Sequence, residues 1–426
     1  MGPAAAPPAR RSSPDLAEVF RRYADAYQQT HRLSGAQQRV IEAVMACRTP
    51  ELGGHLYRCD ACGYEHPAYN SCRNRHCPRC QSLAKARWLD ARQAELLPVD
   101  YFHAVFTLPH EINDLVAMNA RVVLGQLFHS VNACLQAFAR NELDGTLGIV
   151  AVLHTWDQLL RRHLHLHCLI PAGALARDRA RWIPSPQDDF LFRVEPLGIK
   201  FRGHFLAHLQ ALYTQGRLVF PGDLETFRSP NGFRELLDPL YAKTWLPYIK
   251  PPFAGPEKVL DYLGRYTHRV ALSNDRIRAI EDDHVVFRYR DRADGDTLKI
   301  ARIPALAFIG RFLQHVLPDR FLRIRHYGLL SNRAKKQALA RCRTLLGQAA
   351  EPALPAPKST REWILELTGV DIQRCPACGQ LTLHKVADLR PRAAGPAAWP
   401  PIRAPPGALR PSSSLTAASS HPAPSH

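Results

Sequence analysis

Residues 163–170 read HLHLHCLI, and this stretch decides the fold that the chain is expected to adopt. Side chains alternate between the two faces of a β-strand, so His163, His165 and His167 would share one face while the leucines between them enter the opposite layer. The apolar Cys-Leu-Ile that follows favours a strand with a buried end. Three imidazoles at alternate positions can hold one divalent cation. The competing interpretation is a polar strand face with solvated histidines.

Further strands and helices are expected on either side of this stretch. Tyr101–Leu108 and Gly148–His154 read as strands, and the second of them would pair with the histidine strand across a short connection. Another hairpin is expected from His284–Tyr289 and Thr297–Ile303, around the turn Ala-Asp-Gly-Asp. Helical periodicity covers residues 16–27, 34–45, 83–97, 111–142, 256–266, 305–317 and 331–346.

Eleven cysteines raise the choice between metal sites and disulfides. Nothing at the start of the chain resembles a secretory signal, so clustered cysteines favour metal ligands. Two C-x-x-C pairs would form one closed tetrahedral zinc site of four thiolates, with two further residues able to replace a thiolate. The pairs are Cys59 with Cys62 and Cys77 with Cys80, and the further candidates are Cys72 and His76.

A later pair, Cys375-x-x-Cys378, forms half of a zinc site. Its partners could be Cys342 or His384, or the pair could have no metal at all. The sequence leaves these alternatives open because the spacing of a single pair does not identify its partner.

The charge of the chain indicates a nucleic-acid partner. Lys and Arg number 56 against 38 Asp and Glu, which gives a net charge of +18, and 46 of the basic residues are arginines. Guanidinium groups suit bidentate contacts to phosphate. An Arg-rich composition without any such role is the alternative. The hydrophobic fraction of 46% excludes a wholly disordered chain. We expect an intracellular protein without a membrane partner, since no apolar stretch was found to reach about 18 residues.

A third motif lies in the segment EKVLDYLGRYTHR. Tyr262 and Tyr266 are four residues apart, so on a helix both phenols would lie on one face. Two core aromatics would satisfy the same spacing. A phenol, with a reference pKa of about 10, can attack phosphorus when a metal ion polarises the scissile phosphate. The histidine strand and this helix would together provide such an arrangement.

The three motifs together resemble the HUH endonuclease superfamily, and most closely its two-tyrosine transposases of the IS91 type. The phrases SCRNRHCPRCQ, YFHAVFTLP, VLHTWDQ, HLHLHCLIPAG, KPPFAGPEKVLDYLGRYTHRVALSN and RFLRIRHYGLLSNR carry the resemblance, in order, between about residues 50 and 345. The chain departs from the family pattern at Leu164, where proline is more usual, at Asp157, and in the loop Pro171–Ala174.

The resemblance implies a transposase that nicks and transfers single DNA strands through 5′-phosphotyrosine intermediates. Tyr262 and Tyr266 would be the nucleophiles, and His165 and His167 would hold Mg²⁺ or Mn²⁺. His163 would be an outer neighbour and a possible ligand. The motif does not fix the third ligand: Gln158 is the candidate, and the competing interpretation of this residue is a surface amide of the hairpin. Residues expected to contact DNA are Arg73, Arg75, Arg79, Arg265, His268, Arg269, Arg323 and Arg325.

The fold implied is α+β, with a mainly antiparallel sheet carrying helices on its faces and a small N-terminal zinc-ribbon-like module. The expected organisation is a disordered segment 1–13, N-terminal helices and zinc module 14–97, a catalytic domain 98–346, a linker 347–361, a small C-terminal element 362–388 and a disordered tail 389–426.

Two other functions fit the same residues. A rolling-circle replication initiator or relaxase would use the same histidines and tyrosines, because biology rather than active-site chemistry separates these proteins. A non-catalytic, zinc-containing DNA-binding regulator would retain the charge but would not need the tyrosines. All three functions place the protein in the cytoplasm, associated with the nucleoid when it is bound to DNA.

Overall fold

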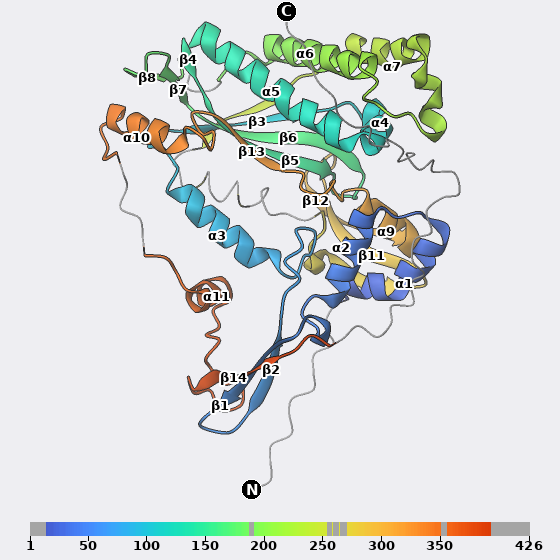
Figure 1. Ribbon diagram of the computed structural model, residues 1–426, viewed down its shortest axis with the longest axis vertical. Coiled ribbons are helices and arrows are strands. Elements are labelled where there is room, and N and C mark those ends of the chain that lie inside the picture. The colour runs from blue at the N-terminus through green and yellow to red at the C-terminus, as the bar shows by residue number, and fades with distance from the viewer. Residues whose placement is uncertain are drawn as a thin grey trace, which may run out of the picture.

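The computed structural model describes residues 14–186, 191–253, 258, 264, 271–350 and 356–392. The fold is α+β, and every strand pairing among these residues is antiparallel, as expected. Figure 1 shows three tiers along the long axis: a sheet under a layer of helices, a smaller helical unit beside a hairpin, and a narrow sheet near the N-terminus.

The first tier is built on a five-stranded sheet of order β13-β5-β6-β3-β9. The predicted histidine strand is β6, and it lies in the centre between β5, the neighbour that was expected, and β3, whose pairing with it was not predicted. A strand with neighbours on both sides has no free edge. Its backbone is hydrogen-bonded on both sides, and this fixes the face to which each side chain points. The bounds are β3 Tyr101–Thr107, β5 Gly148–Trp156, β6 Arg162–Pro171, β9 Tyr248–Phe253 and β13 Ile324–Gly328.

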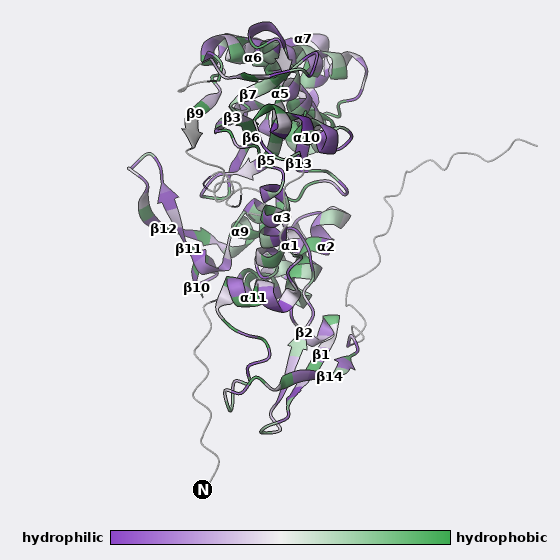
Figure 2. Ribbon diagram, turned by 90° about the vertical axis from the view of Figure 1, so that its left-hand side faces the viewer, coloured by the Kyte–Doolittle hydropathy of each residue, from purple (hydrophilic) through white to green (hydrophobic). Residues whose placement is uncertain are grey.

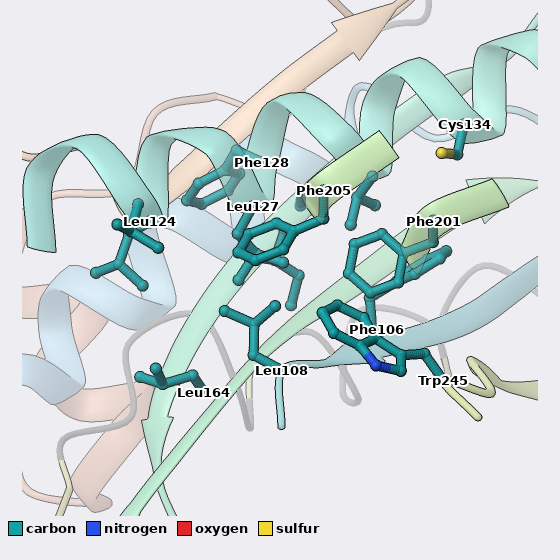
Figure 3. Close-up of a cluster of buried hydrophobic side chains, with 14 of the residues drawn as sticks. Phe106, Leu108, Leu124, Leu127, Phe128, Cys134, Leu164, Phe201, Phe205 and Trp245 are labelled. Atoms are coloured by element: carbon teal, nitrogen blue, oxygen red, sulfur yellow. The ribbon is translucent and has the colours of Figure 1, made fainter. Parts of the chain in front are cut away.

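Helices cover one face of this sheet and enclose the largest core (Figure 1). Leu164 and Leu166 point into this core, as the alternation of β6 requires. The ring of Phe201 meets that of Phe106 edge-on, with centroids 5.2 Å apart, and Figure 3 shows both beside Trp245. The covering helices are α5 Ala120–Glu142, α6 Val194–Thr214 and α7 Pro230–Ala242.

Helix α5 differs from one expectation. Among the described residues it is the one helix that is long and apolar enough to cross a membrane by length and composition, whereas the sequence was expected to contain no such stretch. More than half of its apolar window is buried inside the protein. Its residues Leu127, Phe128 and Leu135 belong to the core above the sheet, which accounts for its apolar composition.

The second tier packs three helices against a three-stranded antiparallel sheet, whose last two strands form the expected hairpin. Ser34 caps the second helix through a capping box with Gln37, so this helix begins where the helical periodicity of residues 34–45 starts. Phe20 meets Phe312 edge-on at 5.7 Å, so the first and last of these helices share one core. Figure 2 shows the hairpin standing away from the body, with hydrophilic residues on its outer strand. The elements are α1 Leu16–Thr30, α2 Gly35–Ala46, α9 Ala305–Leu313, β10 Ile277–Glu281, β11 His284–Asp291 and β12 Thr297–Pro304.

The other face of the main sheet meets α3 (Gln81–Gln93) and α10 (Lys335–Leu345). Val150 and Val152 of β5 pack there with residues of α10, and Leu89 of α3 borders the same cluster. This is the face onto which the histidines of β6 project. Helices α3 and α10 therefore frame the surface on which a cation site was predicted.

The third tier is a sheet of order β14-β1-β2, made of β1 Gly54–Cys59, β2 Glu65–Tyr69 and β14 Leu383–Leu389. β14 pairs with β1 from Gly54 with Leu389 to Cys59 with Leu383. The separate C-terminal element expected at 362–388 is therefore, in its strand, part of the N-terminal module. A sequence pattern could not show this because the paired segments are more than 300 residues apart.

The remaining elements are short or connect the tiers. They are η1 Pro50–Leu52, η2 His110–Ile112, α4 Asn113–Met118, β4 Gly145–Thr146, β7 Gly173–Ala176, β8 Trp182–Pro184, η3 Gly222–Arg228, η4 Asn274–Arg276 and α11 Thr360–Thr368. The helix predicted at 256–266 lies outside the described residues except at Lys258 and Gly264, and both of these are helical.

Candidate functional site

Three histidines meet on the face of the main sheet opposite the large helical core. His165 and His167 extend from β6, and His154 extends from β5, directly across from His165 in the strand register. One ring nitrogen of each lies within 4.8 Å of the others, and all three side chains are buried. The ring centroids of His154 and His167 are 4.6 Å apart, and those of His165 and His167 are 4.8 Å apart. Three converging neutral imidazoles are a donor set for a divalent metal.

The rings of His165 and His167 are oriented by hydrogen bonds that their Nδ1 atoms make to groups outside the histidine group. His165 Nδ1 lies 2.8 Å from the carbonyl oxygen of His163, so Nδ1 is the protonated nitrogen and Nε2 keeps its lone pair. His167 Nδ1 lies 2.9 Å from His103 Nε2, in β3 on the other side of β6. Metal-binding histidines typically have such an outer partner, which fixes the tautomer and the ring orientation.

Burial keeps the imidazoles of His165, His167 and His103 neutral. Desolvation, with smaller contributions from His163 and Arg292, lowers the pKa of His165 to about 3. Desolvation also lowers the pKa of His167, and the neighbouring imidazoles add to the effect. The pKa of His103 falls to about 3, again chiefly through burial. Because a metal ligand must be unprotonated, the site is ready to accept a cation at neutral pH.

The structure changes the set of ligand candidates that the sequence suggested. His163 is exposed and its ring lies beside that of His165, with centroids 4.7 Å apart, but it is not in the converging group. Gln158 lies in the turn after β5, where its carbonyl oxygen accepts a hydrogen bond from Arg276 Nη2 at 2.5 Å. The position across from His165 belongs to His154, which sequence reasoning missed. The sequence feature that could have identified His154 is its position in the neighbouring strand VLHTW, on the same face of the sheet as His165.

In the segment that carries the two predicted nucleophiles, the structure describes one residue between them, Gly264. Tyr262, Tyr266, Arg265, His268 and Arg269 lie outside the described residues. Gly264 is buried, and a Cβ added to it would lie 2.8 Å from Leu89 Cδ1 and 2.9 Å from Lys85 Cε. It therefore contacts α3, which borders the face of the sheet that carries the histidines.

A first group of four cysteines ties three helices together. Cys47 ends α2, Cys80 precedes α3, and Cys72 and Cys77 come from the loop between β2 and α3. Cys72 Sγ and Cys80 Sγ are 3.8 Å apart. Four sulfurs around one zinc ion, each at about 2.3 Å, are separated by about 3.8 Å. The side chain of Arg79 extends the group to α1, because it bonds both the carbonyl oxygen of Cys47 and the carboxylate of Asp15.

A second group of four cysteines joins the two ends of the chain. Cys59 Sγ lies 3.6 Å from Cys378 Sγ, and Cys62 Sγ lies 3.7 Å from Cys375 Sγ. These separations again fit a tetrahedral zinc ion. The hydroxyl of Thr382, 3.1 Å from Cys59 Sγ, lowers the pKa of that thiol to about 6, which favours the thiolate that zinc requires.

The two C-x-x-C turns of this second group have the same backbone pattern. The N–H of Gly63 donates to the carbonyl of Cys59 at 2.9 Å, and the N–H of Gly379 donates to that of Cys375 at 2.8 Å. Both glycines have positive φ, 71° and 76°, which a residue with a side chain adopts at a cost. Each turn therefore brings its two thiols to the same side.

The single zinc site that the sequence suggested is divided in the structure. Cys59 and Cys62 pair with Cys375 and Cys378, whereas Cys77 and Cys80 pair with Cys72 and Cys47. Cys47 was missed because it belongs to no C-x-x-C motif. The alternatives Cys342 and His384 are not in the second group: Cys342 is a buried residue of α10, and His384 pairs with Asp60. His76 is in neither group, and burial lowers its pKa to about 3.

Several arginines proposed for DNA contact are engaged within the protein. Arg79 pairs with Asp15, and Arg75 Nη1 donates to the carbonyl of Phe321 at 2.7 Å. The guanidinium of Arg325 lies 4.2 Å from the ring centre of Phe128, on the helical side of the sheet. Burial lowers the pKa of Arg323 to about 10. Of this described set, Arg73 is the exposed one.

A further arginine, Arg292, was not predicted. It is exposed in the turn between β11 and β12, and its charge contributes to lowering the pKa of His165 and of His167, after desolvation. The hairpin therefore places a positive charge within electrostatic range of the histidine group. No sequence pattern points to this residue, because the hairpin is distant from β6 along the chain.

Two family models match two different parts of the chain. A family model described as "Putative transposase" matches residues 148–338, and one described as "Transposase zinc-binding domain", of the IS91 type, matches residues 19–108. The first range contains the histidine group, and the second contains the first cysteine group.

Two relatives cover most of the chain. A protein of Sinorhizobium fredii described as "Putative transposase y4qJ" is 48% identical over 385 residues, or 89% of this chain and 96% of the relative. A protein of Pseudomonas savastanoi pv. phaseolicola described as "Transposase for insertion sequence element IS801" is 25% identical over 363 residues, or 83% of this chain and 85% of the relative. No solved structure matches the chain.

Proposed function

The chain belongs to the IS91-type transposase family, and from this premise we propose that it cuts and rejoins single DNA strands through tyrosine–DNA intermediates at a metal site held by histidines. The observation that carries the proposal is the buried group of His154, His165 and His167 on one face of the main sheet. A purely structural role would not require three buried imidazoles to converge.

The histidines would hold the cation through their Nε2 atoms, since the Nδ1 atom of His165 and that of His167 have partners on the far side. When bound, the ion would act as a Lewis acid on the scissile phosphate. Three protein nitrogens leave other coordination positions for water and phosphate oxygens, which Mg²⁺ and Mn²⁺ prefer. An all-imidazole donor set also suits zinc or nickel, so the metal must be identified by experiment.

Tyr262 and Tyr266 are the proposed nucleophiles. The phenol oxygen of one tyrosine would bond to phosphorus while the bond from phosphorus to the 3′ oxygen breaks. The phenolic proton passes to solvent, and the departing oxygen takes up a proton to become a 3′-hydroxyl. The phosphotyrosine bond conserves the energy of the broken phosphodiester for a second transfer. The position of Gly264 against α3 supports a location on the histidine face.

DNA would approach this face as a single strand. Arg292 is a candidate for contact with its backbone, since its charge acts on the histidine group and its side chain is exposed. Arg73, exposed beside the first cysteine group, is a second candidate. Arg265, His268 and Arg269 remain proposals from the family resemblance. We place the protein in the cytoplasm because its substrate is the DNA found there.

The two cysteine groups would each hold a structural zinc ion. The first would fix α1, α2 and α3 relative to one another, and the second would hold the C-terminal strand β14 on β1. Both sites have four thiolates and no open position, which is typical of structural rather than catalytic zinc.

Metal removal tests the proposal. A single-stranded oligonucleotide carrying the terminal sequence of the element should be cleaved with Mn²⁺, and chelation with EDTA should reduce cleavage by about 100-fold or more, because the phosphate is no longer polarised. The duplex form of the same oligonucleotide should resist cleavage. Zinc content must be measured after chelation, so that lost activity is not confused with unfolding of the cysteine sites. Undiminished cleavage in EDTA with zinc retained would contradict a metal-dependent reaction.

A further inference from the structure

A second group of three histidines lies on the helical layer, away from the proposed reaction site. His129 extends from α5, and His204 and His208 extend from α6. Residues four apart on a helix are neighbours on one face, so His204 and His208 project together toward α5. One ring nitrogen of each histidine lies within 4.8 Å of the others.

The three rings form a compact triangle. The centroids of His204 and His208 are 4.3 Å apart, and that of His129 is 5.5 Å and 5.4 Å from them. Three nitrogens bound to one ion at about 2.1 Å lie about 3.4 Å apart. A modest rotation of rings is therefore enough to complete the geometry, and the exposed His129 side chain can make that rotation.

Hydrogen bonds orient the rings of His204 and His208. In metal sites, a hydrogen bond to the ring nitrogen that does not bind the metal has the same effect. His208 Nδ1 lies 2.8 Å from the carbonyl oxygen of His204, so Nδ1 carries the proton and Nε2 keeps its lone pair. His204 Nδ1 lies 3.1 Å from the hydroxyl of Ser130, which is fully buried and accepts a hydrogen bond from Gln126. Partial burial and then the neighbouring His208 and His129 lower the pKa of His204, so its ring is neutral at pH 7.

The location separates this group from the strand-transfer chemistry. α5 and α6 pack on the face of the sheet that receives Leu164 and Leu166, whereas His165 and His167 project from the other face. A cation held by His129, His204 and His208 would bridge two helices that otherwise meet through apolar contacts and the hydrogen bond between His204 and Ser130. Its effect would be on stability rather than on the DNA reaction.

We propose that His129, His204 and His208 form a surface site for a divalent cation of the zinc, nickel and copper class, which fastens α5 to α6. Neutral imidazoles are preferred by these ions, whereas magnesium and calcium prefer oxygen ligands. The site has three protein ligands and is partly exposed, so water would complete the coordination.

Nickel titration of the full chain tests the site. The parent should be the zinc-loaded variant His165→Ala/His167→Ala, because it lacks the pair of histidines on β6. Calorimetry should show one Ni²⁺ bound per chain, and a hundredfold excess of Ni²⁺ over Kd should raise Tm by about 2 °C or more. Adding His204→Gln or His208→Gln should abolish both effects.

The matched control is His110→Gln, which changes an exposed histidine elsewhere and should leave nickel binding intact. No nickel uptake by the parent, or equal uptake after His204→Gln, would overturn the proposal. Neither result would bear on DNA cleavage, because the parent lacks the histidines on which cleavage is proposed to depend.

Discussion

Replacing His165 and His167 together by alanine is expected to lower the rate of DNA strand cleavage by about 10³-fold or more. The pair supplies two of the three imidazoles that converge on one point. Losing them removes the cation and several kcal/mol of charge stabilisation in the transition state, and about 4 kcal/mol corresponds to a thousandfold in rate. Binding of single-stranded DNA should survive, since neither ring is needed for backbone contacts. Single-turnover cleavage and a binding titration on the same preparation would measure both quantities.

Two single variants act as matched controls for this result. His163→Ala changes the exposed neighbour on the same strand and should alter cleavage only a few-fold. His103→Gln removes the partner of His167 Nδ1 and should cost about 10-fold to 100-fold, the usual effect of losing an outer partner. If the double alanine variant does not fold, His165→Gln/His167→Gln gives the same test with less change in volume. A His163→Ala variant as impaired as the double variant would place the metal site elsewhere.

Replacing Cys77 by serine is expected to remove one of two zinc ions and to unfold the junction of α1, α2 and α3. Cys77 is fully buried and belongs to the first cysteine group. Structural zinc contributes an apparent binding free energy of about 10–16 kcal/mol, and this binding energy is coupled to folding. Zinc content after dialysis against a weak chelator, together with hydrogen exchange of residues 14–93, would report both losses.

The second cysteine group makes a separable prediction. Cys378→Ser should also remove one zinc ion, but it should loosen β14 from β1 and leave α1 and α2 folded. Cys342→Ser is the control, because Cys342 is a buried residue of α10 and belongs to neither group. If the wild-type chain holds one zinc ion and the Cys378→Ser variant keeps that ion, the result would instead support the single site built from Cys59, Cys62, Cys77 and Cys80.

The local parts of the fold could be predicted from the sequence. Alternation in HLHLHCLI identified β6 and the face of its histidines, and helical periodicity over residues 34–45 identified α2. Each signal lies within a short stretch of sequence, so strand and helix periodicity are sufficient to detect it.

The long-range parts of the site could not be predicted in this way. His154 belongs with His165 only because of the register between β5 and β6. Cys47 has no motif of its own, and Cys375 meets Cys62 across 313 residues of sequence. Motif spacing detects ligands that are close along the chain, whereas pairing between distant segments depends on the tertiary fold.

We propose that a tyrosine of this chain bonds covalently to DNA while histidines hold the metal. The most direct measurement is a denaturing gel of the full chain incubated with Mn²⁺ and a single-stranded element end labelled on the 3′ side of the cleavage position. We predict a labelled protein–DNA band in the wild-type chain. The band should weaken in each single variant, Tyr262→Phe or Tyr266→Phe, and disappear in the double variant. Persistence of the band in a folded double variant that still binds DNA would contradict the account.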